Sequence, residues 1–549
     1  MSRGIGMART VVVPPYRLEF RPSPGSKFSP MDLTAVKNFA DVLDLGTAAH
    51  GDRDMFVIGD DRTSWNEMKA RAGRVANALA ANGVGSQDRV AFIDKNSVEY
   101  VEVLFGCAYR NAVTVAVNWR LAPPEMAYIV NDSQATVLVI HEEFADHLAA
   151  FRGDLEHVTT VVVIGDAGND VAYRDWRDAH DSDFERIPAA DDDVCSQLYS
   201  SGTTGHPKGV QSTNANFQAL FSTVEWDMDD DSRNLAVLPF FHIGGGGWAL
   251  FGMAAGATTC TTREFDPAGI LQIIQAERIT HAIFVPAMLQ FFLLVPSDDI
   301  DLSSMEYIAY GASPITEDVL VKSMAQFAGT KFFQVYAMTE STGAGTTLPP
   351  EDHGGNADPK LLRSAGKPIP GMEMKIVDPD TGEEVPDGEV GEIWMRHGGN
   401  MKGYWNLPEE TARALPGDGW LRTGDAAYLE DGYLYIHDRV KDMIVSGGEN
   451  VYPAEVENAL MSHESVADVA VIGVPDDKWG EVGKALVIPV PDSGVTGDEI
   501  LRHVRERLAG FKVPHSVEFI EEIPRNPTGK ILKRLLREPY WEGHDRRVQ

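Results

Sequence analysis

The sequence predicts an α/β protein in two parts: a large N-terminal domain of βα units with mainly parallel sheets, and a small C-terminal α+β domain. At 549 residues the chain is too long for one compact core, so more than one domain is expected. From residue 31 onward, amphipathic helical segments alternate with short apolar strands, a pattern typical of parallel sheets with helices on both faces. A smaller α/β pattern restarts near residue 443.

These patterns divide the chain into four segments. Residues 1–30 are rich in Pro, Arg and Ser and predict a loosely held tail. Residues 31–438 make up the main domain, residues 439–442 a boundary segment, and residues 443–549 the C-terminal domain.

The individual elements can be followed along the sequence. Apolar side chains at helical spacing over residues 67–81 predict an amphipathic helix, which Asn82 and Gly83 end. The next predicted elements are a strand at 89–93, a helix at 98–108, a strand at 113–117 and, after another helix, a strand at 136–140. The C-terminal domain is predicted to contain a helix at 454–461 and a strand at 466–474.

Net charge and cysteine content narrow the class of protein. The formal net charge of -34 argues against nucleic acid as a partner, because such partners require a positive face. It also means that any nucleotide site must be locally positive. Cys107, Cys195 and Cys260 are far apart and odd in number, which indicates neither a disulfide framework nor a Cys-x-x-Cys metal site. Such cysteine usage fits a reducing cytosol, so a cytoplasmic location is expected.

A transmembrane segment is not expected. The most apolar stretch, residues 282–295, is about half as long as a membrane span and contains Pro286, so it predicts a buried element. Peripheral membrane contact and a homodimer both stay open at this stage.

The most informative motif is the segment from Tyr199 to Val210, which combines glycines, Ser and Thr hydroxyls and Lys208. Glycines let backbone N–H groups approach a phosphate, and the lysine offsets its negative charge. The motif is not a Walker A loop, because Pro207 precedes the lysine and Gly209 follows it. By itself the segment is equally compatible with a phosphate-binding loop and with a surface linker.

Further motifs follow downstream in a defined order. They are Gln334-Val335-Tyr336-Ala337-Met338-Thr339-Glu340, Arg422-Thr423-Gly424-Asp425, Asp438-Arg439-Val440-Lys441-Asp442, Ser446-Gly447-Gly448-Glu449-Asn450 and Pro524-Arg525-Asn526-Pro527-Thr528-Gly529-Lys530. In this order and spacing, and together with the Tyr199 segment, they resemble the adenylate-forming superfamily of acyl-CoA synthetases, luciferases and peptide-synthetase adenylation domains. The resemblance extends from about residue 31 to residue 540.

The resemblance implies an ATP site with Mg²⁺. The loop would hold the β- and γ-phosphates through Ser200, Ser201, Gly202, Thr203, Thr204, Gly205 and Lys208. Adenine and ribose would contact Gly311, Ala312, Ser313, Gln334, Tyr336, Ala337, Met338, Asp425, Ile436 and Arg439. Thr339 would bond the α-phosphate, while Glu340 and Thr203 would hold the metal ion. The alternative for Tyr336 is a core aromatic at a strand end, and a lone glutamate such as Glu340 after an apolar strand is usually a solvated residue.

The resemblance also implies a moving C-terminal domain. Lys530 would bridge the attacking carboxylate and the α-phosphate, and Lys441 would be the hinge. Gly447, Gly448 and Glu449 would admit the pantetheine arm of coenzyme A. A lysine in a basic C-terminal segment is usually a solvated surface residue, but Pro527 and Gly529 predict a turn around Lys530, and the positive local charge fits an anionic partner.

The acid that is activated would bind near residues 238–247. His242 stands where peptide-synthetase domains carry an aspartate for an amino-acid ammonium group, so an amino acid is not expected. Gly244 and Gly245 would let an apolar chain approach the backbone, and neighbouring aromatic residues would form an apolar wall. The segment could also be a flexible loop beside a core helix, with His242 simply a satisfied histidine.

The expected function is therefore ATP-dependent activation of a carboxylic acid, with a fatty acid favoured, followed by transfer to coenzyme A. No insertion follows Lys441, which favours a complete CoA ligase over an acyl-AMP ligase that stops at the adenylate. Steroid side-chain acids and aryl acids remain open as substrates. The remaining alternative is a non-catalytic nucleotide-binding protein on the same scaffold.

Overall fold

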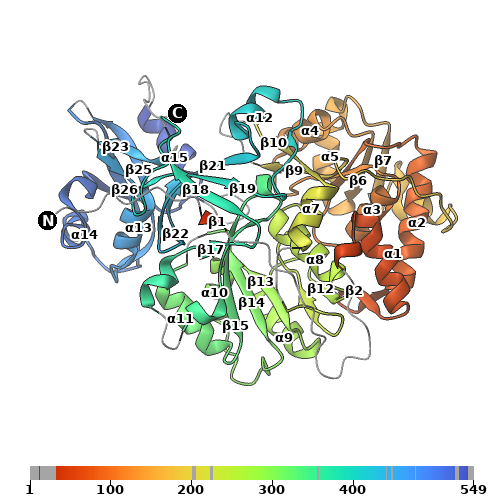
Figure 1. The fold of residues 1–549 in the computed structure, drawn as a ribbon, viewed down its shortest axis with the longest axis horizontal. Coiled ribbons are helices and arrows are strands. Elements are labelled where there is room, and N and C mark those ends of the chain that lie inside the picture. Colours follow the sequence, from red (N-terminus) through yellow and green to blue (C-terminus); the bar gives the residue numbers. More distant parts are fainter. Residues whose placement is uncertain are drawn as a thin grey trace.

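The fold is described from a computed structural model (Figure 1), which covers residues 11–12, 33–200, 206–222, 227–313, 315–354, 358–379, 381–439, 442–446, 449–476, 478–525 and 531–541. Figure 1 shows a large body that contains the N-terminal and central elements, with the C-terminal elements α13 to α15 gathered at one end.

A mixed sheet with a parallel centre carries the predicted phosphate-binding segment. Its strands run in the order β20-β10-β9-β5-β4-β6-β7-β8 among the described residues, with β10 antiparallel to both neighbours. The bounds are β20 (Gly403–Tyr404), β10 (Lys208–Thr213), β9 (Val194–Ser200), β5 (Val113–Ala116), β4 (Arg89–Ile93), β6 (Val137–His141), β7 (Thr160–Ile164) and β8 (Val171–Ala172).

A second mixed sheet carries the motif that ends at Glu340. Its order in the described chain is β17-β16-β15-β14-β13-β11-β12-β2-β3, parallel from β15 to β2 and antiparallel at both edges. The bounds are β17 (Lys367–Pro368), β16 (Gly345–Leu348), β15 (Lys331–Ala337), β14 (Tyr307–Gly311), β13 (His281–Phe284), β11 (Arg233–Leu235), β12 (Thr258–Thr261), β2 (Asp54–Ile58) and β3 (Asp61–Ser64).

Two smaller sheets complete the fold. An antiparallel sheet contains β1 (Val11–Val12), β18 (Glu373–Val377), β19 (Gly391–Arg396), β21 (Trp420–Glu430) and β22 (Tyr433–Arg439). The C-terminal sheet contains β24 (Glu449–Val451), β23 (Ile444–Ser446), β26 (Gly480–Pro489), β25 (Val466–Asp476) and β27 (Ser516–Phe519), and it encloses an apolar core of its own. Because β1 pairs with β18, two residues of the predicted tail belong to a sheet.

Helices cover the sheets in the manner expected of βα units. Those of the N-terminal and central regions are α1 (Phe39–His50), α2 (Trp65–Ala81), α3 (Val98–Tyr109), α4 (Pro123–Asp132), α5 (Ala145–Phe151), α6 (Tyr173–Asp178), α7 (Asn214–Phe221), α8 (Trp248–Ala254), α9 (Pro267–Ala276), α10 (Pro286–Phe292), α11 (Glu317–Gln326) and α12 (Pro408–Ala414). The C-terminal domain adds α13 (Pro453–Met461), α14 (Gly497–Arg505) and α15 (Lys533–Trp541).

The predicted fold class is confirmed, and so are the elements expected from periodicity, to within a few residues at their ends. Helix α2 begins at Trp65 because Ser64 caps it: the Glu67 N–H donates to Ser64 Oγ at 3.2 Å. The prediction for residues 282–295 is wrong in part. The segment splits into β13 and α10, and Phe291 and Leu294 are exposed, because the apolar stretch turns its last residues away from the core.

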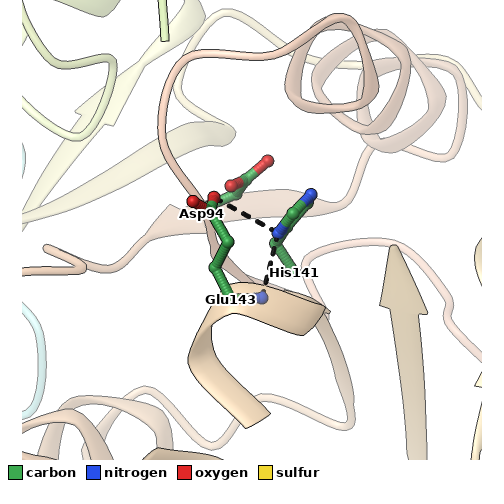
Figure 2. A group of neighbouring side chains, drawn as sticks. All are labelled: Asp94, His141 and Glu143. Atoms are coloured by element: carbon green, nitrogen blue, oxygen red, sulfur yellow. Dashed lines mark hydrogen bonds and ion pairs between the residues drawn. The ribbon is translucent and has the colours of Figure 1, made fainter. Parts of the chain in front are cut away.

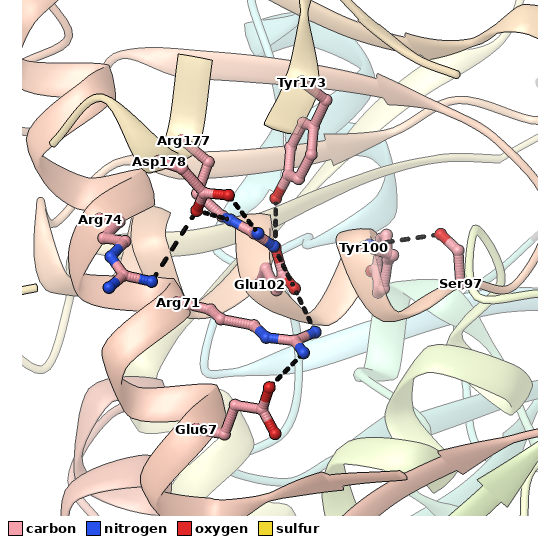
Figure 3. Close-up of polar contacts among 9 residues, drawn as sticks. All are labelled: Glu67, Arg71, Arg74, Ser97, Tyr100, Glu102, Tyr173, Arg177 and Asp178. Carbon is pink, nitrogen blue, oxygen red and sulfur yellow. Dashed lines mark hydrogen bonds and ion pairs between the residues drawn. The ribbon is translucent and has the colours of Figure 1, made fainter. Parts of the chain in front are cut away.

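A buried carboxylate holds α2, α3 and α6 together (Figure 3). Glu102 on α3 is fully buried, and it accepts hydrogen bonds from Tyr173 Oη at 2.8 Å, Arg177 Nη1 at 3.0 Å and Arg71 Nη1 at 3.1 Å. Its three partners come from α2 and α6, so one side chain on α3 fixes the packing of two neighbouring helices.

In the described part of the chain, none of the helices has the length and apolar character required to cross a membrane.

Candidate active site

The segment predicted to bind phosphates includes the end of one strand and the start of the next, and these two strands are antiparallel. Strand β9 ends at Ser200 and β10 begins at Lys208, and these two residues are paired across the ladder. Because β9 also pairs in parallel with β5, Ser200 lies at the carboxyl edge of the sheet, where ligands of α/β sheets bind. Residues Ser201, Gly202, Thr203, Thr204 and Gly205 lie outside the described residues.

Lys208 is buried beside a carboxylate that no sequence motif indicates. Its Nζ lies 2.5 Å from Glu410 Oε2 on α12, and 5.1 Å from the centre of the Tyr404 ring on β20. The hydrogen bond from Lys208 lowers the pKa of the Glu410 carboxyl group. An ion pair and an aromatic face therefore hold the lysine side chain in the interior.

Glu340 meets the same hairpin from the second sheet. It lies on the 3₁₀ turn η5 (Thr339–Ser341), directly after β15, and its side chain is buried. Its Oε1 accepts hydrogen bonds from Ser200 Oγ at 2.8 Å and from Tyr404 Oη at 3.1 Å. The fold thus brings together Ser200, Lys208 and Glu340, with Thr339 next to Glu340 on the turn.

The residues predicted to contact adenine and ribose lie along β14, β15 and β21. Tyr336 Oη donates to Asp425 Oδ2 at 2.7 Å, which joins β15 to β21. Asp425 is paired with Arg439 across the β21–β22 ladder, and Ile436 lies exposed on β22. Only the backbone of Arg439 is described.

A buried glutamate holds the part of β21 that precedes Asp425. Glu392 on β19 accepts the Gly424 N–H at 3.1 Å and pairs with Arg422 at 2.8 Å. The sequence did not predict a role in the site for Glu392, Tyr404 or Glu410. The available signal was weak: Tyr404 stands in a short Gly-Tyr-Trp stretch, and Glu392 and Glu410 lie in ordinary acidic segments.

The backbone predicted to support adenine lies at the carboxyl end of β14. Gly311 pairs with Val335, and a Cβ at this position would lie 2.0 Å from the Val335 carbonyl oxygen, so only glycine fits without a shift. Ala312 follows with φ +67°, which turns the chain towards Ser313. Opposite, β15 carries Gln334, Tyr336 and Ala337, and Met338 follows it. The Gln334 Oε1 atom is buried and has no hydrogen-bond partner among the described residues.

The predicted acyl segment forms a π-helical turn, η4 (Ile243–Gly247), ahead of α8. Close backbone packing requires one of the two predicted glycines: a Cβ on Gly245 would lie 2.2 Å from the Pro239 carbonyl oxygen, whereas one on Gly244 would meet only a side chain at 3.5 Å. The neighbouring aromatic residues predicted to form an apolar wall, Phe240, Phe241, Trp248 and Phe251, are buried in the main core. Backbone contact therefore explains why residue 245 is a glycine.

His242 stands next to this turn as a neutral imidazole. Burial, with the positive charge of Arg120, lowers the pKa of His242 to about 4. Within the described residues its buried Nε2 atom has no hydrogen-bond partner. The prediction that no carboxylate lies here to pair with the ammonium group of an amino-acid substrate stays untested. A neutral imidazole beside apolar side chains suits an uncharged ligand.

Several predicted residues cannot be placed. Lys530, the hinge residue Lys441, Gly447 and Gly448 lie outside the described residues, and only the backbone of Glu449 is described, on β24.

A second polar cluster, Asp94, His141 and Glu143, has a composition that could suit a metal ion (Figure 2). Both carboxylates already have cationic partners, however. Arg263 binds Asp94 through both terminal nitrogens and also pairs with Glu143, and Lys95 Nζ lies 2.9 Å from Glu143. The cluster is therefore an ion-pair network that joins the carboxyl ends of β4 and β6 to the segment after β12.

Comparison with known proteins agrees with this geometry. The family model described as AMP-binding enzyme matches residues 44–405, and the model of the AMP-binding enzyme C-terminal domain matches residues 455–530. A fatty acid–[acyl-carrier-protein] ligase, ScoC from Streptomyces coeruleorubidus, is 38% identical over 91% of this chain and 96% of its own. A feruloyl-CoA synthase from Amycolatopsis sp is 40% identical over 86% of this chain and 93% of its own.

Solved structures show the same fold. A Mycobacterium tuberculosis fatty acyl CoA synthetase superposes with a TM-score of 0.74 at 35% identity, covering 93% of this chain and 99% of the other. The chain belongs to the AMP-binding enzyme family of adenylate-forming enzymes. Within that family it is an adenylate-forming acyl-CoA ligase.

Proposed function

We propose that the protein activates an apolar carboxylic acid, with a fatty acid favoured, and transfers the acyl group to coenzyme A. The acid would attack the α-phosphate of ATP to give an acyl-adenylate and pyrophosphate, and the thiol of coenzyme A would then displace AMP. The observation that carries the proposal is the meeting of Ser200, Lys208 and Glu340 at the carboxyl edges of two sheets.

The described residues suggest how each end of ATP would be held. Lys208 would neutralise the phosphates that leave, and Thr339 would bond the α-phosphate from the turn beside Glu340. Tyr336 and Asp425, which are already hydrogen-bonded at 2.7 Å, would contact adenine and ribose. Gly311, Ala312 and Ser313 would support the base through the backbone.

Glu340 fits a magnesium ion. Its carboxylate is buried between two hydroxyl donors and offers the hard oxygen ligands that Mg²⁺ favours. A bound ion would offset phosphate charge, and Thr203 is proposed as a second ligand. Glu340 also orients the Ser200 and Tyr404 hydroxyls, which both donate to its Oε1.

The second half-reaction would use the C-terminal domain. Lys530 is proposed to steady the α-phosphate during adenylation, Lys441 to act as the hinge, and Gly447, Gly448 and Glu449 to line the path of the pantetheine arm. The domain boundaries at residues 438 and 443 belong to this proposal.

The identity of the acid is the finer part of the proposal. The uncharged His242 and the lack of a predicted carboxylate near it support an apolar acid such as a fatty acid. An aryl acid is the second candidate, because a feruloyl-CoA synthase is among the similar relatives. A steroid side-chain acid is the third candidate substrate.

A substrate panel tests these proposals. Purified protein is given MgATP and fatty acids of graded length, ferulate or a steroid side-chain acid, and pyrophosphate release and loss of free coenzyme A thiol are both measured. We expect both signals with a fatty acid. Pyrophosphate release without thiol loss would indicate an enzyme that stops at the adenylate or uses another acceptor, and no release with any acid would indicate a binding protein.

A further inference from the structure

The proposed phosphate site contains a carboxylate, that of Glu410, whose negative charge would repel a bound phosphate. Lys208 and Glu410 form a close pair at 2.5 Å, with side chains only 8% and 17% exposed. A carboxylate in this position competes with phosphate oxygens for the same ammonium group, because both are anionic acceptors. An ATP site would gain nothing from such a residue unless the pair can open.

Arg413 gives Glu410 a second partner. It lies one turn further along α12 and pairs with Glu410 Oε1, whereas Lys208 takes Oε2. The arginine is 64% exposed, so it reaches Glu410 from the solvent side. If Lys208 turned to a phosphate, Glu410 would keep a counter-charge and would not be left as an unpaired, partly buried carboxylate, which would be costly.

The backbone around the pair is tightly held. Tyr404 on β20 pairs with Val210 on β10, and its N–H donates to Thr411 Oγ1 on α12 at 2.9 Å. The Trp405 N–H donates to the Gly209 carbonyl oxygen at 2.8 Å. Helix α12 is thus fastened to the strand that carries Lys208, so the exchange needs only side-chain movement.

We propose that Glu410 is a positioning residue that competes with pyrophosphate for Lys208, and that Arg413 holds Glu410 while the nucleotide is bound. Re-pairing of Lys208 with Glu410 then favours release of the pyrophosphate product. This inference rests on the proposed role of Lys208 as a phosphate ligand.

The test measures pyrophosphate as a product inhibitor of adenylate formation, and its binding to the free enzyme by calorimetry. Glu410→Gln removes the competing charge and keeps the shape, so pyrophosphate should bind about 5-fold more tightly, the effect expected of one partly exposed charge pair. Arg413→Gln should act in the opposite direction, because Glu410 then relies on Lys208 alone. The double variant Glu410→Gln/Arg413→Gln should resemble Glu410→Gln.

Glu409→Gln is the matched control. It makes the same charge change on the same helix, but Glu409 is 90% exposed, and its one ion pair among the described residues is with Arg413, at 3.9 Å. Its pyrophosphate affinity should stay within about 2-fold of the parent protein, the limit for an exposed pair. Thermal unfolding of each variant shows that the fold is retained.

Lys208→Met separates this inference from the proposed function. If Lys208→Met weakens pyrophosphate binding while Glu410→Gln leaves it unchanged or weakens it, the inference is overturned and the role of Lys208 stands. If Lys208→Met has no effect on pyrophosphate binding, the proposed role of Lys208 fails, and the inference fails with it.

Discussion

Gly311 and Lys530 are proposed site residues of two different kinds. At Gly311 the absence of a side chain lets β14 approach the Val335 carbonyl group, at the edge of the sheet where the backbone is proposed to support adenine. Lys530 instead would contribute a charge to the reaction. Substituting Gly311 should therefore affect stability and nucleotide binding, whereas substituting Lys530 should affect the chemical step.

Gly311→Ala should disturb both the proposed adenine-binding backbone and the pairing of β14 with β15. Its Cβ would lie 2.0 Å from a backbone oxygen that cannot move freely, so we expect a loss of about 1–3 kcal/mol in the free energy of unfolding and a higher KM for ATP. Gly153→Ala is the control, because no atom lies within 4 Å of the place that its Cβ would take, and it should change stability by less than about 0.5 kcal/mol. Equal urea midpoints for the two variants would contradict the steric argument.

Lys530→Ala should separate the half-reactions. Adenylate formation should fall by at least about 100-fold, as for removal of a group that stabilises transition-state charge. Thioester formation from supplied acyl-adenylate should be largely retained. Pyrophosphate exchange measures the first step and coenzyme A thiol loss the second. A similar loss in both steps would show that the lysine does not belong to adenylation alone.

At the scale of elements, the Glu102 network decides how α2, α3 and α6 pack (Figure 3). The helices themselves follow from apolar spacing and a Ser64 cap, but their mutual placement depends on a charge that helical periodicity does not reveal. Removing a buried acceptor leaves the facing donors unsatisfied, whereas removing an exposed partner does not.

Glu102→Ala should therefore lower the free energy of unfolding by about 3 kcal/mol, because Tyr173 and two arginines lose their common acceptor. Glu67→Ala is the matched control: Glu67 is 46% exposed, pairs with Arg71 along one helix, and should cost about 0.5 kcal/mol or less. The comparison uses urea unfolding followed by circular dichroism. A Glu102→Ala variant no less stable than Glu67→Ala would refute the structural role.

At the scale of the whole molecule, burial of neutral histidines makes stability depend on pH. Burial lowers the pKa of His397 to about 4, against 6.5 for a free imidazole, and its Nδ1 accepts the Gly399 N–H at 2.9 Å. The unfolded chain then binds a proton at higher pH than the folded one. The contribution of the neutral His397 to the free energy of unfolding is therefore complete above pH 6.5 and is lost as pH falls towards 4.

His397→Asn should reduce this pH dependence, because the Asn Oδ1 can accept the same N–H but cannot be protonated. Between about pH 7.5 and pH 5, the urea midpoint of the parent protein should fall further than that of the variant. Parallel pH profiles for the two proteins would show that His397 does not contribute.

Much of the fold could be predicted because its signals are local. Helix and strand periodicity indicated the βα units to within a few residues, and spaced motifs indicated the family and the residues Ser200, Lys208 and Glu340. The partners of these residues could not be predicted in the same way. Tyr404 and Glu410 reach Lys208 from about two hundred positions downstream, and no short pattern marks them.

The sequence by itself determined the fold class and the adenylate-forming family, because periodicity and spaced motifs are properties of short segments. Only the tertiary structure decided that Ser200 donates to Glu340, that Glu410 pairs with Lys208, and that Gly245 is required by the backbone of Pro239. The first two contacts join segments far apart in the chain, and the third lies within one tight turn. All three exist only once packing has brought the groups within contact distance.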